Sequence, residues 1–142
     1  YRTDCHPAHH SSFIEFGGIW PPHCVEGTRG GAIHESFYTK VENPANRPDP
    51  NRNIFRKGCK QDEEQYSGYE AVNSNGVALK DYANKDVVVS GIATEYCVYN
   101  TVNEFLKSGR NVELLHDALG YVDYEGHKKT IKDLREMVTV VE

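Results

Sequence analysis

The chain has 142 residues with 16 basic and 21 acidic side chains, which leaves a formal net charge of −5 at pH 7. This length suits one domain with a core of its own, and the charge balance argues against a nucleic-acid partner because it offers no basic stripe for phosphates. No apolar run approaches the ~18 residues of a membrane helix. We therefore expect a single cytoplasmic domain over residues 1–142 that has no membrane partner.

The first half of the sequence reads as loops around short elements. Residues 1–35 are rich in His, Gly, Pro and aromatic side chains, and residues 43–53 hold three prolines and four asparagines, which is typical of a surface excursion. Residues 70–82 are compatible with a helix that is interrupted at 73–76. The chain opens directly on a histidine-rich cluster, so we expect that it begins inside a strand and that an N-terminal strand and helix are missing.

The second half has a clear α/β pattern. Residues 86–90 form a β-branched run, typical of a strand buried on both faces, and Val98, Val102, Phe105 and Leu106 share one helical face. A strand at 112–115, a helix around 125–137 and a strand at 138–141 follow. Alternation of strands and helices predicts a doubly wound, mostly parallel α/β sheet flanked by helices.

Three residues near the start could hold a metal ion. Asp4 and His6 lie two positions apart, so in an extended segment both would project to one side. His23 could join them from the Trp20–His23 turn, and two imidazoles with one carboxylate suit Zn, Fe(II) or Mn. His9 and His10 are further candidates. The spacing alone is common, and a histidine-rich loop is more often polar surface.

The four cysteines are best explained as reduced thiols, because no signal peptide is visible and their spacing is not that of a small disulfide-rich scaffold. No C-x-x-C pair of a zinc finger is present either. Among them, Cys97 follows the strand at 86–90 and precedes a helix, where ligands bind in parallel sheets. A helix N-terminus favours the thiolate and could hold an oxyanion. From position alone, a nucleophile and a buried filler are equally good interpretations of Cys97.

Four sequence blocks together resemble the nicotinamidase/pyrazinamidase branch of the isochorismatase-like cysteine hydrolases. In chain order they are DCHPAHHSSF (4–13), WPPHCVEGT (20–28), KGCKQDEEQYSGY (57–69) and GIATEYCV (91–98). The resemblance spans the chain from Asp4 to the strand at 138–141. Their combination is far more specific than any single block, and the fold it implies agrees with the α/β pattern.

The resemblance implies roles for individual residues. Cys97 is the expected nucleophile, and Lys57 the expected lysine of an Asp–Lys–Cys triad. Asp4, His6 and His23 are the expected ligands of one divalent transition metal, with zinc preferred and iron or manganese as alternatives.

Four more residues are expected, on the same basis, to line the substrate pocket. Trp20 and Tyr66 would flank an aromatic ring. Ile92 and Ala93 fall where the family has a cis peptide that directs an N–H group at the oxyanion. The implied reaction is hydrolysis of nicotinamide to nicotinate and ammonia through a thioester, as in NAD salvage, by a possible homo-oligomer.

Departures from the family pattern leave alternatives open. Cys5 replaces the usual tryptophan, Glu95 stands where aspartate is commoner, and residues 43–53 resemble an insertion. The catalytic aspartate of the family lies upstream of the Asp4 position, which is why we expect a missing segment. An amidase for another small amide, or a non-catalytic metal-binding homologue, therefore remain as alternatives.

Overall fold

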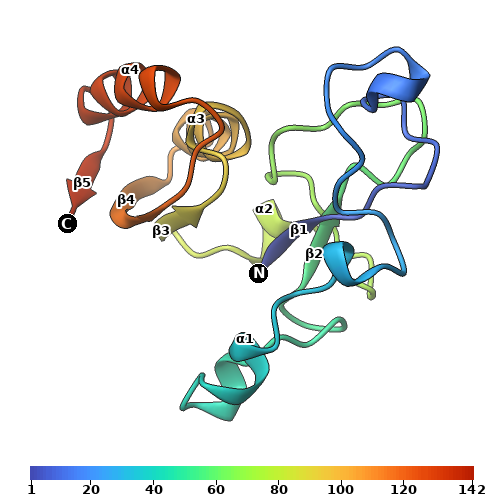
Figure 1. Cartoon of the computed structure of the whole chain (residues 1–142). Helices are drawn as coiled ribbons and strands as arrows, with labels where there is room; N and C mark the ends of the chain where they lie inside the picture. The colour runs from blue at the N-terminus through green and yellow to red at the C-terminus, as the bar shows by residue number, and fades with distance from the viewer. The chain divides into compact units, whose positions relative to one another are not determined.

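A computed structural model describes all 142 residues, and the chain divides into two compact units, residues 1–79 and 80–142 (Figure 1). Each unit is described by itself below. None of the helices in either unit has the length and apolar character needed to cross a membrane.

The first unit is built on two short parallel strands, β1 (Arg2–Asp4) and β2 (Phe55–Lys57). Their register sets Asp4 opposite Lys57. The chain between the strands carries only short helical turns: η1 (Ile14–Phe16), η2 (Arg29–Gly31), α1 (Ser36–Thr39) and η3 (Pro44–Asn46). Residues 43–53 are mostly exposed, as the proline-rich composition predicts.

The core of the first unit consists of apolar side chains around these strands. Phe13, Ile54, Phe55 and Ala71 are all at most 5% exposed. The predicted helix over residues 70–82 is wrong except at its end, where α2 spans Leu79–Tyr82. Instead, Val72 forms antiparallel bridges with Arg56 and Ala78, because the Asn73–Gly76 turn reverses the chain. Backbone pairing to β2 here outweighs the weak helical periodicity.

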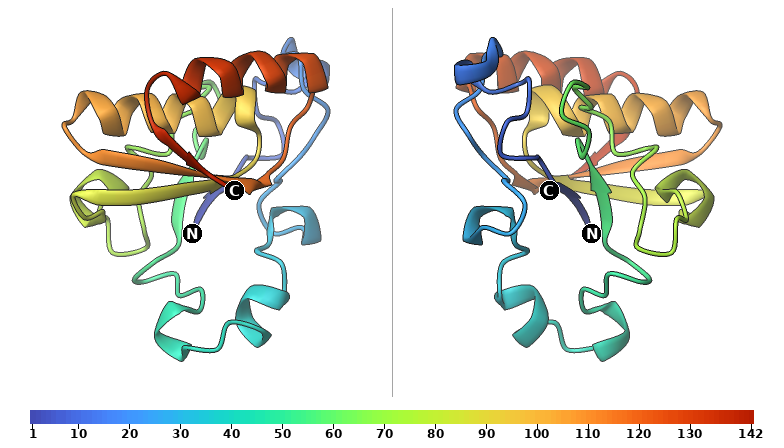
Figure 2. Two further views of the ribbon diagram at one scale, coloured as in Figure 1. Left: turned by 90° about the vertical axis from the view of Figure 1, so that its left-hand side faces the viewer. Right: turned by 90° about the vertical axis from the view of Figure 1, so that its right-hand side faces the viewer.

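The second unit confirms the predicted α/β class. Its elements in order are β3 (Asp86–Gly91), a π-helical turn η4 (Thr94–Val98), α3 (Tyr99–Lys107), β4 (Asn111–Leu119), α4 (Tyr124–Arg135) and β5 (Thr139–Val141). The three strands are parallel in the order β3-β4-β5. Both helices lie on the same face of this sheet (Figures 1 and 2), as expected when consecutive crossovers have one hand.

Burial in the second unit follows this one-sided arrangement. Val102 of α3, Leu114 of β4 and Leu134 of α4 are fully buried between the helices and the sheet. Val88, in contrast, is 65% exposed, so the prediction that the strand at 86–90 is buried on both faces is wrong for this unit. Alternation along β3 gives one covered face and one open face.

Candidate functional site

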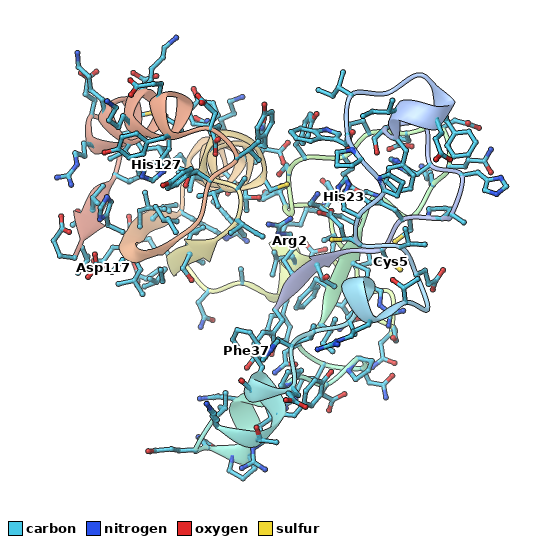
Figure 3. All side chains as sticks on the ribbon, in the orientation of Figure 1. Arg2, Cys5, His23, Phe37, Asp117 and His127 are labelled. Carbon is cyan, nitrogen blue, oxygen red and sulfur yellow. The ribbon has the colours of Figure 1, made fainter.

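The first unit brings Asp4, His6 and His23 together. One possible ligand atom from each residue lies within 4.8 Å of the others. Asp4 ends β1, and His6 follows it in an extended segment that forms a parallel bridge with Val25. Because of this bridge, the turn that contains His23 (labelled in Figure 3) lies next to the end of β1. The His6 and His23 rings contact each other edge to face, with centroids 4.9 Å apart.

Hydrogen bonds fix which nitrogen each imidazole presents. Nδ1 of His6 lies 2.8 Å from the Gly58 carbonyl oxygen, and Nδ1 of His23 lies 2.8 Å from that of Pro21. A carbonyl only accepts, so both Nδ1 atoms carry the proton and both Nε2 atoms keep a lone pair. Burial lowers the pKa of His6, which favours the neutral ring that binds metals. This donor set therefore fits a divalent transition metal with open coordination positions.

Lys57 is a buried cation beside this cluster. Its side chain is only 2% exposed, and its ammonium group forms an ion pair with the Asp4 carboxylate. The same ammonium donates to the backbone oxygen of Gln65 at 2.6 Å. Because a buried ammonium group is costly without partners, these two contacts offset the desolvation of the Lys57 side chain.

Gln65 is a supporting residue that sequence reasoning missed. Besides accepting from Lys57 through its backbone, it accepts from the Gly58 N–H through Oε1 at 3.0 Å. Gln65 therefore holds both the lysine and the glycine whose carbonyl orients His6. Nothing in the local spacing signals this role, because it depends on a loop that returns to the end of β2.

The other two histidines of the cluster do not join the metal-ligand group. His10 is fully buried, but Nδ1 contacts the Ser12 hydroxyl at 2.7 Å and Nε2 contacts the Glu63 carbonyl at 3.1 Å. Both of its nitrogens are thus occupied by protein groups. His9 is exposed and stacks on Phe16 with ring centroids 5.1 Å apart. The structure therefore excludes both from the candidate set.

Two of the expected pocket residues contact each other. The indole N–H of Trp20 donates to the Tyr66 hydroxyl at 3.1 Å. Two aromatic side chains from loops 46 positions apart are thereby joined within the first unit. This hydrogen bond limits the rotation of both rings. The two rings can therefore form one preformed side of a pocket for a flat ligand.

Cys97 lies in the second unit, on the turn between β3 and α3. Its side chain is partly exposed, and it falls inside η4 rather than before a regular helix. The Ile92–Ala93 peptide that precedes the turn is cis. Thr94 and Val98, at the two ends of this turn, are buried, so the turn is anchored while Cys97 stays partly accessible.

Further anchors attach this turn to the start of α4. The Thr94 N–H and hydroxyl both donate to the Gly120 oxygen at 2.9 Å, and Nδ1 of His127 lies 3.0 Å from the Thr94 hydroxyl. Since that hydroxyl has already used its proton, His127 is the donor. Glu95 Oε1 accepts from the N–H groups of Val122 and Asp123 at 2.9 and 2.7 Å. Glu95 thus fixes the turn to the segment before α4. The sequence alone did not reveal this role.

Comparison with known proteins places the chain in a family. The isochorismatase domain matches residues 64–142, which is more than half of the chain. A solved pyrazinamidase of Pyrococcus horikoshii in complex with zinc is 33% identical and superimposes with a TM-score of 0.79, over 99% of this chain and 73% of that one. PnC1 from L. infantum in complex with nicotinate is 30% identical with a TM-score of 0.78, over 99% and 69% of the two chains.

The curated relatives also carry nicotinamidase or pyrazinamidase names. A nicotinamidase/pyrazinamidase of Mycobacterium tuberculosis is 32% identical over 135 residues, which cover 92% of this chain and 65% of that protein. A nicotinamidase of Escherichia coli is 28% identical over 134 residues, which cover 80% of this chain and 59% of that protein. The chain thus spans about two thirds or less of the length of the curated relatives it matches.

Proposed function

The chain belongs to the isochorismatase domain family, and from this premise we propose that the protein is a metal-dependent nicotinamidase. It would hydrolyse nicotinamide to nicotinate and ammonia through a thioester on Cys97. The observation that carries the proposal is the cluster of Asp4, His6 and His23, whose imidazoles both keep Nε2 available. Relatives with nicotinamidase or pyrazinamidase names support the substrate class.

The chemistry begins with the accessible thiol. The Cys97 thiol loses its proton, and the thiolate attacks the amide carbon to form a tetrahedral intermediate. Collapse of this intermediate breaks the C–N bond, the proton from the thiol is returned to the leaving nitrogen, and ammonia is released with a thioester left on Cys97. Water then attacks the thioester, releasing nicotinate and restoring the thiol. The N–H groups of Ala93 and Cys97 are the proposed donors to the oxyanion, at the turn that Thr94 and Glu95 hold in place.

The first unit supplies binding and charge in this proposal. Trp20 and Tyr66 would flank the pyridine ring as the hydrogen-bonded aromatic pair. Lys57, the expected lysine of the triad, would contribute a buried positive charge. Asp4, His6 and His23 would hold the divalent metal, which when bound supplies a Lewis acid for the ring nitrogen of the substrate. Zinc suits two imidazoles and a carboxylate, and iron and manganese are the alternatives to test.

Replacement of the nucleophile tests the proposal. In the full-length protein, we expect Cys97→Ala to abolish ammonia release from nicotinamide while the metal content, measured by mass spectrometry of the elements, stays normal. The matched control is Cys59→Ala, assayed under reducing conditions, which removes an exposed thiol and should retain turnover. Substantial ammonia release by Cys97→Ala would refute the thioester route.

The substrate class is tested separately with the wild-type protein. We expect kcat/KM for nicotinamide and pyrazinamide to exceed that for aliphatic amides, because the side chains proposed to flank the substrate, Trp20 and Tyr66, are aromatic. Preference for an aliphatic amide would instead identify an amidase with another substrate. Tight binding of nicotinamide without ammonia release would identify a non-catalytic homologue.

A further inference from the structure

Two cysteines outside the proposed reaction lie in contact in the first unit. Cys5 (Figure 3) is buried, with 8% exposure, and Cys59 is exposed. The Cys5 and Cys59 side chains lie close enough to interact electrostatically. The Cys59 thiol in turn donates to the Lys57 carbonyl at 3.6 Å, and that carbonyl also accepts from the Cys5 N–H at 2.9 Å. One carbonyl therefore holds both residues together, 54 positions apart in sequence.

The backbone explains why the two sulfurs meet. Parallel pairing sets Asp4 opposite Lys57, so Cys5 and Cys59 lie just beyond the last paired positions of neighbouring strands. Cys59 is one residue further along than the position opposite Cys5. A strand spacing of about 4.8 Å with an offset of about 3.3 Å along the strand still falls inside the Cα range that a disulfide spans. Gly58, with φ +62°, ends the extended run of β2 directly before Cys59. Contact between the thiols thus follows from the sheet register and one glycine.

From this contact we propose that Cys5 and Cys59 form a reversible disulfide that acts as a redox switch on the metal-ligand cluster. The oxidant is a low-molecular-weight disulfide of the glutathione type. The exposed Cys59 sulfur attacks it, which breaks the S–S bond, forms a mixed disulfide and releases one small thiol. The Cys5 sulfur then displaces the second small thiol, so two protein thiols are oxidised, one external disulfide is reduced, and the protons leave with the two released thiols.

The position of the pair links the disulfide to the metal-ligand cluster. Cys5 lies between Asp4 and His6, and Cys59 follows the glycine whose carbonyl orients the His6 ring. A disulfide brings two sulfurs to about 2.05 Å, much closer than a thiol hydrogen bond allows. The movement is therefore transmitted to the Gly58 carbonyl and to the peptide between the two ligands, and the oxidised form should bind zinc more weakly.

Burial of one partner sets the pace of this reaction. Cys5 is only 8% exposed, so an external disulfide reaches Cys59 first and the second exchange is slow. Equilibration over hours, rather than a short pulse of oxidant, is the appropriate design.

The test is disulfide mapping after equilibration of the full-length protein in mixtures of oxidised and reduced glutathione. We expect a cross-linked peptide pair that contains Cys5 and Cys59 and disappears on reduction. Cys59→Ser is the variant that should lose it, and Cys24→Ser, which removes a thiol from the same unit, should retain it. Persistence of free Cys5 and Cys59, a stable mixed disulfide on Cys59, or pairing of either with Cys24 or Cys97 would overturn the proposal.

Zinc affinity, measured by competition with a chromophoric chelator, tests the switch itself. We expect oxidised wild-type protein to bind zinc at least several-fold more weakly than the reduced form, with recovery on reduction, and oxidised Cys59→Ser to show no such change. Equal affinity in the two redox states would refute the switch. Neither readout measures ammonia, so their outcome is independent of the proposed amidase activity.

Discussion

At the scale of single residues, His6 and His23 show how hydrogen bonding makes a common side chain a candidate metal ligand. Each ring has one nitrogen committed to a backbone carbonyl, which leaves the other for a metal. His10, which is more completely buried than His23, has no nitrogen to spare. Burial alone therefore does not identify a ligand, whereas the accounting of hydrogen bonds does.

This distinction predicts the outcome of a histidine substitution. We expect His23→Ala to deplete bound zinc, because removing one of three ligands leaves an incomplete set. The matched control is His9→Ala, which removes an exposed histidine from the same loop region and should leave the metal content unchanged. Metal stoichiometry of the purified proteins is the measurement, and an unaltered value for His23→Ala would contradict the ligand assignment.

At the scale of elements, the site depends on how strands end. β2 ends at Lys57, and the left-handed Gly58 then turns the chain so that its carbonyl meets His6. An added Cβ at Gly58 would lie 2.5 Å from Cε1 of the His6 ring. In the second unit, the turn after β3 is held by Thr94 and Glu95, which reach the segment before α4. Functional side chains thus follow strand ends, as parallel sheets favour.

The strand end at Gly58 can be tested against a second glycine. Gly76 has a similar φ of +76°, but nothing lies within 4 Å of its added Cβ. Alanine at either position costs about 1–2 kcal/mol of stability from the left-handed conformation. Only Gly58→Ala should also lower zinc affinity, by about tenfold or more, as expected when a residue that orients a ligand is disturbed. Equal zinc affinities in the two variants would show that the Gly58 contact does not support the ligand.

At the scale of the whole molecule, the functional residues are divided between two compact units. The proposed metal ligands, Lys57 and the aromatic pair all belong to residues 1–79, and the proposed nucleophile belongs to residues 80–142. The first unit has few regular elements and short strands, so a bound ion is expected to stabilise it strongly. The second unit has its own helix-covered sheet.

This division predicts a local response to metal removal. A ligand at 100 times its Kd stabilises the state it binds by about 2.7 kcal/mol. Because all three ligands lie in the first unit, we expect a chelator to accelerate hydrogen exchange of amides in β1 and β2 far more than in β3 and β4. Mass spectrometry of exchanged peptides would show this. Uniform acceleration across both units would contradict a metal effect confined to residues 1–79.

The sequence by itself determined the α/β class of the second unit and supplied the candidates for the chemically important side chains. Periodicity located β3 to β5 and the buried face of α3, since apolar spacing reflects local geometry and burial together. Cysteine, histidine and aspartate in four ordered blocks pointed to the proposed chemistry. Local patterns failed for residues 70–82, where pairing of Val72 to β2 replaced the expected helix.

Only the tertiary structure decided which of these groups meet and how they are oriented. It joined His23 to Asp4 and His6, excluded His10, and disclosed Gln65 as the support of Lys57. It also placed Cys59 against Cys5. The physical reason is that these contacts span tens of residues and depend on strand register, a left-handed glycine and the direction of individual hydrogen bonds. No local pattern of residues encodes such quantities.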